Sequence, residues 1–153
     1  MSQNDEKNTN NDTPRILIGF DFGMKRIGMA IGQTLTQTAR PLDTLQAKDG
    51  VPNWNVLTQL IQKWRPHAFV VGIPLNMDGT DQPITQQARV FAEKLRDRYH
   101  LPVHEMDERL TTKDARERLF TQGGYKALQD GQVDRVAAQL ILQNWFAEHS
   151  NDT

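Results

Sequence analysis

Residues 16–32 read ILIGFDFGMKRIGMAIG, an apolar run that ends in an acid, a short turn, and a second apolar run. This pattern predicts two paired strands. Because successive side chains of a strand point to opposite faces, Asp21 shares its face with Leu17 and Gly19. The other face of the first strand carries only large apolar side chains: Ile16, Ile18, Phe20 and Phe22. The hairpin therefore presents one carboxylate near the end of its first strand.

The second strand of this hairpin has one face without bulky side chains. Its small residues Gly28, Ala30 and Gly32 alternate with large apolar ones, and so they lie on one face. Such a face lets a helix or a substrate backbone approach closely. We therefore expect this face to pack beside a functional site, with Asp21 as a metal ligand or a phosphate-site group.

The composition is that of a soluble globular domain. The chain has 153 residues, of which 37% are hydrophobic and 24% charged, and its formal net charge is −1. No apolar run has membrane-spanning length, and the N-terminus has no apolar signal core. The chain has no cysteine, which excludes disulfides and cysteine-ligated zinc and favours the cytoplasm. A net charge near zero neither requires nor excludes a nucleic-acid partner.

The chain is predicted to fold as one domain over residues 14–148. Residues 1–13 are almost entirely polar and are predicted to be a disordered tail, with a second short tail over 149–153. After the hairpin, apolar patterns predict strands at 37–47, 68–73 and 101–106, and helices at 54–64, 84–99, 112–120 and 133–145. Pro66 ends the first of these helices, and Gly123-Gly124 ends the third.

This order of elements predicts an α/β fold. An antiparallel meander of three strands is followed by strands that alternate with helices, which implies crossover connections to parallel strands. We expect a mixed five-stranded sheet with helices on both faces, the ribonuclease H-like arrangement.

Three acids lie where this layout brings distant segments together. Asp21 ends the first strand, Glu108 follows the fifth strand beside Asp107, and Asp134 lies near the start of the last helix. Magnesium prefers hard oxygen ligands, and two or three carboxylates with a substrate phosphate suit it. Two such ions about 4 Å apart can activate water and stabilise the leaving oxygen in phosphodiester hydrolysis.

Each acid also has a purely structural interpretation. Asp21 could be an ordinary turn residue, and Asp134 could complement the helix dipole. Glu108 could pair at the surface with Arg109 or Arg116, which contributes little to stability. The joint placement of the three acids favours a catalytic site over these interpretations.

Five motifs in register give a more specific indication. They are GFDFG at 19–23, RIGMA at 26–30, VGIPLNMDG at 71–79, DERLTT at 107–112 and DRVAA at 134–138. Together they closely resemble the bacterial YqgF (RuvX) family, over about residues 15–146. Its members are described as Holliday-junction-resolvase-like proteins and pre-16S rRNA nucleases. The resemblance implies a ribonuclease H-like fold, a nuclease site that uses Mg²⁺ or Mn²⁺, and maturation of the 5′ end of 16S rRNA.

The resemblance implies that Asp21, Glu108 and Asp134 are the catalytic acids and the metal ligands. Related junction resolvases carry an acid after the fourth strand, where this chain has Asn76 and Asp78. The motifs leave open whether Asp107 or Asp78 shares the metal site, because Asp78-Gly79 is equally a turn signal.

Polar residues near the acids are predicted to bind substrate. Arg26 follows Asp21 and could meet a phosphate, or it could be a solvated turn residue. Arg109 and Lys113 follow Glu108 along the chain. Asn76 belongs to the loop 76–80, which could position substrate or could only connect a strand to a helix.

The aromatic and basic residues of the first two helices have simpler interpretations. Trp54 and Trp64 lie on an apolar stripe, which favours core positions over base stacking. Arg89, Arg96 and Arg98 are interleaved with acids, as on a solvated helix face.

Other functions compete with a nuclease of precursor 16S rRNA. One is a Holliday-junction DNA endonuclease, and another is a non-catalytic factor that binds RNA or a transcription complex. A nucleotide-binding ATPase or sugar-kinase fragment also fits the Asp21 hairpin, but it would need a second lobe that 153 residues do not supply. We expect a nucleic-acid partner, no membrane, and a monomer or a weak homodimer.

Overall fold

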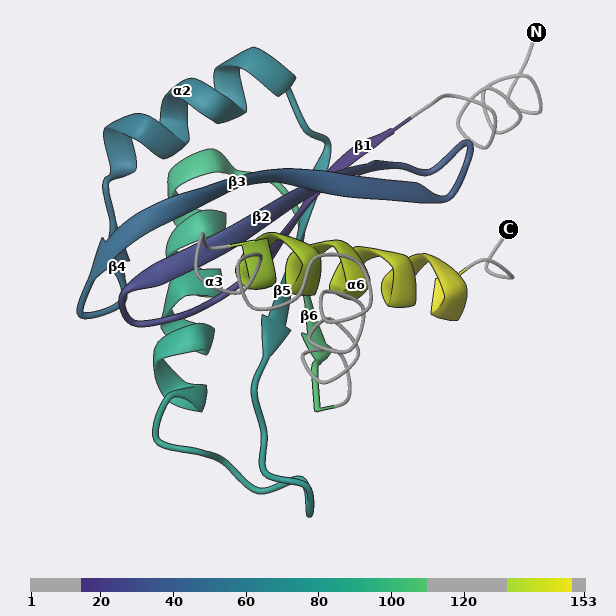
Figure 1. Cartoon of the computed structure of the whole chain (residues 1–153). Helices are drawn as coiled ribbons and strands as arrows, with labels where there is room; N and C mark the ends of the chain where they lie inside the picture. Colours follow the sequence, from purple (N-terminus) through teal and green to yellow (C-terminus); the bar gives the residue numbers. More distant parts are fainter. Residues whose placement is uncertain (1–14, 110–131, 150–153) are drawn as a thin grey trace, which may run out of the picture.

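The computed structural model describes residues 15–109 and 132–149. Six strands of this part of the chain form one sheet in the order β4-β3-β2-β1-β5-β6 (Figure 1). The strands are β1 (Ile16–Asp21), β2 (Arg26–Gln33), β3 (Thr38–Lys48), β4 (Val51–Pro52), β5 (Ala68–Ile73) and β6 (Val103–Asp107). The helices are α2 (Trp54–Trp64), α3 (Thr85–Tyr99) and α6 (Gln132–His149). Strands β1 to β4 pair antiparallel, whereas β5 runs parallel to both β1 and β6.

The mixed sheet is as predicted, but the strand count of five is wrong. The additional strand is β4, which has only two residues and pairs with Ala47 and Lys48. A tight turn precedes it, with positive φ at Asp49 and Gly50. Two residues cannot display the alternation by which a strand is identified, so the sequence pattern does not reveal it.

Helices cover both faces of the sheet, which confirms the predicted layers. Helices α2 and α3 pack on the face that presents Ile18, Phe20 and Phe69 (Figure 1). Helix α6 packs on the opposite face, through Ile141 and Leu142 among others. The alternation predicted for the hairpin therefore separates its side chains between two distinct cores.

The small residues of the hairpin form the surface on which α6 packs. A Cβ at Gly19 would lie 2.6 Å from Leu142 Cγ, and one at Gly32 would lie 2.9 Å from the Phe146 ring. A Cβ at Gly28 would collide with the backbone carbonyl of Asp134. The predicted packing face is thus confirmed, and its close contact places the start of α6 over the Asp21 end of the hairpin.

Local signals explain where helix α2 begins and ends. The Asn53 side chain accepts hydrogen bonds from the backbone N–H groups of Asn55 and Val56, which caps the helix N-terminus. Arg65 adopts a left-handed conformation with φ 49° and ends the helix just before Pro66. The helix predicted at 54–64 is confirmed.

Several predictions concern segments outside the described residues. These are the tail at 1–13, the helix at 112–120 with the glycine pair after it, and residues 150–153 of the second tail. Residue His149, assigned to that tail, is the last residue of α6. None of the helices in the described ranges is long and apolar enough to cross a lipid bilayer.

Candidate active site

Asp21 lies between two glycines in the sheet. In the strand register it pairs with Gly28 of β2 on one side and with Gly72 of β5 on the other. Residues paired across neighbouring strands point to the same face. Neither neighbour has a side chain, so the sheet forms a bare floor on both sides of the Asp21 carboxylate.

Glu108 covers the floor on the Gly72 side. It follows β6, and its backbone N–H donates to the carbonyl of Ile73 at 3.2 Å. Its carboxyl oxygen Oε2 occupies the space that a Cβ at Gly72 would need. Glu108 is 7% exposed, and within the described residues its Oε2 has no hydrogen-bond partner. A side chain predicted at the active site is therefore buried directly beside Asp21.

Burial and two neighbouring acids affect the ionisation of Glu108. Burial raises the pKa of Glu108 to about 7, a side-chain hydrogen bond with Asp21 opposes this rise, and the charge of Asp107 adds to it. A buried carboxyl resists ionisation because it has lost its hydration. The Glu108 carboxyl can therefore gain or lose a proton near neutral pH.

Asp134 covers the floor on the Gly28 side. It lies in the first turn of α6, and its carboxylate accepts a hydrogen bond from Arg26 Nε at 3.1 Å. The side chains of Arg26 and Asp134 are 53% and 22% exposed. Since Gly28 and Gly72 flank Asp21, Asp134 and Glu108 lie over positions two strand spacings apart, roughly 10 Å.

The sheet thus brings the three predicted acids to adjacent positions. Among residues 15–109 and 132–149, however, no three acidic or histidine side chains already form a cluster that could hold a metal ion. Arg26, predicted to bind substrate, instead engages Asp134 in this conformation. Glu108 faces Asp21, whereas Asp134 faces Arg26.

The proposed surface pair between Glu108 and Arg109 is not formed. Arg109 Nη2 lies 2.6 Å from Asp107 Oδ2, and its backbone N–H also donates to Asp107 at 3.0 Å. Partial burial opposes ionisation of Asp107, but the hydrogen bonds and charge of Arg109 hold the pKa of Asp107 below its usual value. Of the two neighbouring acids, Asp107 is engaged by Arg109, and Glu108 faces Asp21.

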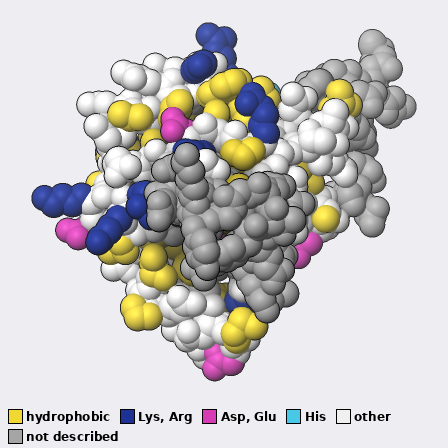
Figure 2. Space-filling model, viewed as in Figure 1, with side chains coloured by type: hydrophobic (Ala, Val, Ile, Leu, Met, Phe, Trp, Pro, Cys, Tyr) yellow, Lys and Arg dark blue, Asp and Glu magenta, His cyan; other side chains and the backbone are white. Residues whose placement is uncertain are grey.

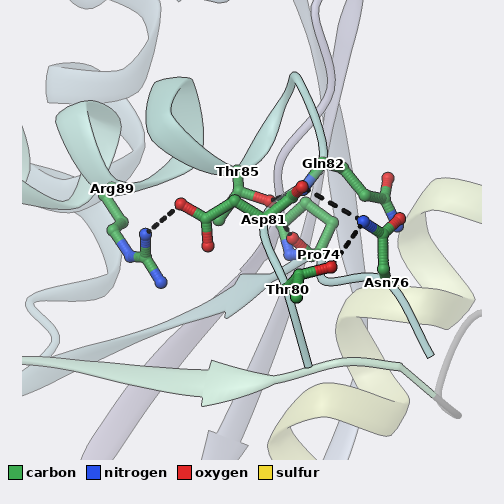
Figure 3. Close-up of polar contacts among 7 residues, drawn as sticks. All are labelled: Pro74, Asn76, Thr80, Asp81, Gln82, Thr85 and Arg89. Carbon is green, nitrogen blue, oxygen red and sulfur yellow. Dashed lines mark hydrogen bonds and ion pairs between the residues drawn. The ribbon is translucent and has the colours of Figure 1, made fainter. Parts of the chain in front are cut away.

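The loop 76–80 is internally braced. The Asn76 amide donates to Thr80 Oγ1 at 2.9 Å and to the Asp81 carbonyl at 3.1 Å (Figure 3). Asp78 accepts hydrogen bonds from the Thr80 hydroxyl and backbone N–H, which lower the pKa of Asp78. Gly79 completes the turn with φ 88°. The Asn76 amide protons are thus used to shape the loop, and Asp78 acts as its turn residue.

Further contacts fix this loop to the rest of the domain. The buried Thr85 hydroxyl donates to the Pro74 carbonyl, and Asp81 pairs with Arg89 at 3.0 Å (Figure 3). Arg109 Nη1 donates to the Met77 carbonyl at 3.1 Å. Arg109 therefore ties the loop after β5 to the end of β6, where the acids lie.

The remaining predictions concern peripheral residues. Lys113 and Arg116 lie outside the described residues. Trp54 and Trp64 pack against the core, as expected, and Trp54 stacks on Phe91 with centroids 6.0 Å apart. The ion pair of Arg96 with Glu93 agrees with the mixed-charge face expected on α3, and a second pair joins Arg96 to Glu105 of β6.

Sequence reasoning missed the part that Gly72 plays. A glycine inside a buried strand is a sign of close approach by another group, and this sign was present in the strand at 68–73. Arg135, in the first turn of α6, was also missed. Its Nη1 donates to Thr44 Oγ1 at 3.3 Å, which helps to fix the start of α6 on β3.

Comparison with known proteins agrees with this geometry. The family model described as RuvX, Holliday junction resolvase, matches residues 15–148. The chain belongs to the RuvX family. The resemblance inferred from the five motifs is confirmed, and the family and fold are those of hydrolases that cut phosphodiester bonds.

Close relatives of this RuvX protein carry the name "Putative pre-16S rRNA nuclease". The protein from Aeromonas salmonicida is 57% identical over 134 residues, covering 88% of this chain and 96% of its own. The one from Shewanella oneidensis is 51% identical over 138 residues, covering 90% and 98%. The similarity thus extends over nearly the whole length of both chains.

Solved structures confirm the ribonuclease H-like fold. RuvC of Thermus thermophilus, in complex with a Holliday junction, has a TM-score of 0.55 and 15% identity, covering 89% of this chain and 96% of its own. The fowlpox virus resolvase with Holliday junction DNA has a TM-score of 0.53 and 12% identity, covering 89% and 99%. These two similarities show the fold, and the family match with the nuclease relatives favours a nuclease over one lobe of an ATPase or sugar kinase.

Proposed function

We propose that this RuvX protein is a divalent-metal-dependent nuclease that processes the 5′ end of precursor 16S rRNA. The observation that carries the proposal is the buried Glu108 carboxyl beside Asp21, over a sheet floor of glycines. The names of relatives at 57% and 51% identity support the rRNA substrate.

The donor set fits a hard divalent cation. Glu108 Oε2 is buried with no hydrogen-bond partner among the described residues, and the Asp21 carboxyl is its neighbour. Carboxylate oxygens are the ligands that Mg²⁺ and Mn²⁺ take up. Asp21 and Glu108 would hold the ion, and Asp134 would be the third acid of the site. The bound ion supplies polarisation of the phosphoryl oxygen and a more acidic water.

The residues around the acids are suited to hold the substrate backbone. Lys25 in the β1–β2 turn, Arg26 at the start of β2 and Lys48 at the end of β3 are exposed. The β1–β2 turn and the end of β3 are joined, since the Ala47 N–H donates to the Lys25 carbonyl at 2.8 Å. Figure 2 shows Lys and Arg side chains at the side of the molecule where β2, β3 and β4 meet in Figure 1. Contacts to phosphates fix the register of a nucleic acid without reading its sequence.

A precursor rRNA is favoured over a DNA junction. The junction resolvases share only 15% and 12% identity with this chain, which supports a common fold but not a common substrate. The relatives named for precursor 16S rRNA share more than half of its aligned residues. We place the activity in the cytoplasm, on a monomer or a weak homodimer.

The test compares two substrates and three cations. The purified full chain is incubated with precursor 16S rRNA or with a synthetic four-way DNA junction, in Mg²⁺, Mn²⁺ or Ca²⁺. We expect cleavage of the RNA near its mature 5′ end in Mg²⁺ and Mn²⁺ but not in Ca²⁺. Asp21→Asn is expected to lower the rate at least about 100-fold, because it removes a charge that holds the ion.

The matched control is Asp49→Asn. Asp49 is an exposed acid on the β3–β4 turn with φ 52°, a conformation that asparagine tolerates, so its activity should equal that of the wild type. If only the junction is cleaved, the substrate is DNA and the proposed RNA substrate is wrong. Tight RNA binding without cleavage under any condition would favour the non-catalytic factor.

A further inference from the structure

A pocket of about 470 Å³ adjoins the candidate active site. It lies between the loop 76–80, the end of β6 and the C-terminal part of α6. Its lining includes three apolar side chains and three charged ones: Met77, Met106, Ala147, Asp107, Arg109 and Glu148. Asp107 and Arg109 are the chain neighbours of Glu108, so a ligand in this pocket lies beside the segment that carries Glu108. The volume is within the usual range of small-molecule sites.

Met77 is the most unusual residue of this pocket. Its side chain is 73% exposed, although it is apolar. The loop that carries it is held by the Asn76 and Asp78 hydrogen bonds and by Arg109 on the Met77 carbonyl. An exposed apolar side chain on a braced loop loses little conformational entropy of the backbone when it contacts a ligand. Thioethers make favourable contacts with aromatic rings.

The charges of the lining disfavour the phosphate of a nucleic acid and are compatible with a base. Asp107 and Glu148 are acidic, and the guanidinium of Arg109 is already bonded to Asp107 and to the Met77 carbonyl. Two carboxylates against one engaged cation disfavour a phosphate. An uncharged aromatic ring that carries an amino group can pack against the thioethers and donate a hydrogen bond to a carboxylate.

We propose that this pocket binds one unpaired nucleobase of the strand being cut, next to the scissile phosphate, with Met77 against the ring and Glu148 accepting from its amino group. This inference rests on the proposed nuclease function. It makes adenine, cytosine or guanine preferred over uracil at that position, since uracil has no amino group. The base must leave any duplex to enter, so cleavage is confined to unpaired segments.

The binding test uses a fluorescent base and no catalysis. Single-stranded RNAs from the 5′ region of precursor 16S rRNA carry 2-aminopurine at successive positions, and they are bound to the full chain in Ca²⁺. We expect one position at which binding changes the fluorescence strongly. Met77→Ala should abolish that change, and Met77→Leu should retain it because it keeps the apolar surface. Leu35→Ala is the matched control, since Leu35 is 61% exposed on the β2–β3 turn.

The kinetic test uses an abasic nucleotide at the position so identified. It should lower kcat/KM of the wild type about tenfold, within the range found for base contacts to side chains. The same substitution should have little further effect on Met77→Ala, because the two changes remove one contact. Glu148→Gln should reduce the preference for an amino-bearing base over uracil.

The outcomes separate this inference from the proposed function. RNA cleavage without a position-specific fluorescence change would overturn the base pocket and leave the nuclease intact. A position-specific change that depends on Met77, without cleavage in Mg²⁺ or Mn²⁺, would support the pocket and overturn the nuclease. The pocket would also be overturned if Met77→Ala and Leu35→Ala lowered kcat/KM equally and each effect added to that of the abasic nucleotide.

Discussion

Glu108 lies over Gly72, the residue that pairs with Asp21 across the central strands of the sheet. The missing side chain of Gly72 is the space that the Glu108 carboxyl occupies. A glycine in β5 and an acid after β6 are therefore one structural unit, although 36 positions separate them in the sequence. The unit places a buried carboxyl beside Asp21, and its Oε2 has no hydrogen-bond partner among the described residues.

Gly72→Ala is expected to displace Glu108. The new methyl group would meet Glu108 Oε2 and Ile141 Cδ1, so the carboxyl would have to move away from Asp21. We expect the nuclease rate to fall about 10- to 100-fold, with a loss of about 1–3 kcal/mol in the free energy of unfolding. Rates per folded molecule and urea unfolding curves measure the two effects.

The control for this variant is Gly19→Ala. Its methyl group would press on Leu142 of the same helix but would not reach Glu108. It should cost a similar amount of stability and leave the rate per folded molecule nearly unchanged. If both variants lose activity in proportion to their stability, Gly72 has only a packing role.

The metal-free protein is expected to lose stability as the pH rises from about 4.5 to about 7. The pKa of Glu108 is about 7 in the folded protein because of burial and 4.5 without it. The folded protein therefore favours the protonated carboxyl over the ionised one. The stability that the protonated Glu108 contributes is fully present below pH 4.5 and is lost as the pH rises through 7. The difference is on the order of 3 kcal/mol. Glu108→Gln should remove it, as measured by urea unfolding in a chelator between pH 4 and 8. Parallel curves for the two proteins would contradict this account.

His104 should give a pH dependence of the opposite sign. Its ring lies 5.0 Å from that of Trp145, and burial, His149 and Arg96 lower the pKa of His104. The folded protein disfavours the protonated ring, so stability is present above pH 6.5 and lost as the pH falls through the lowered pKa. In the same unfolding series, His104→Gln should remove the loss of stability at acid pH and leave the loss caused by Glu108 at higher pH unchanged. If the loss of stability at acid pH is the same in this variant, His104 does not contribute to it.

The parts of the fold predicted correctly have short-range causes. Strict alternation over residues 16–32 determines both faces of the hairpin, because each side chain's face depends only on its position in the strand. Helix α2 follows from its apolar spacing, the Asn53 cap and Pro66. Strand β4 escaped prediction because its two residues pair only through the turn at Asp49 and Gly50.

The candidate site depends on contacts that no local pattern encodes. The sequence suggested Glu108 as one of the acids, but its burial depends on the space at Gly72 in another strand. The pair between Arg26 and Asp134 joins residues 108 positions apart. The catalytic and metal-binding roles of Asp21, Glu108 and Asp134 stay predictions.

Removal of Arg26 should have opposite effects on the metal and on the RNA. In the structure Arg26 Nε bonds the Asp134 carboxylate at 3.1 Å, so a cation that recruits Asp134 must compete with it. Arg26→Gln should therefore strengthen Mn²⁺ binding about two- to fivefold, the factor expected for an exposed ion pair. The same variant should raise KM for RNA, because a phosphate contact is lost. Calorimetric Mn²⁺ titration and steady-state kinetics measure the two changes.

Lys25→Gln separates the specific effect of Arg26 from that of positive charge alone. Lys25 is the adjacent exposed cation in the chain, so its loss removes the same unit charge. Both variants should raise KM for RNA, but only Arg26→Gln should change the geometry around Asp134. If Mn²⁺ binding strengthens equally in both, long-range charge explains the effect. If it weakens in Arg26→Gln, then Arg26 positions Asp134 for the ion instead of competing with it.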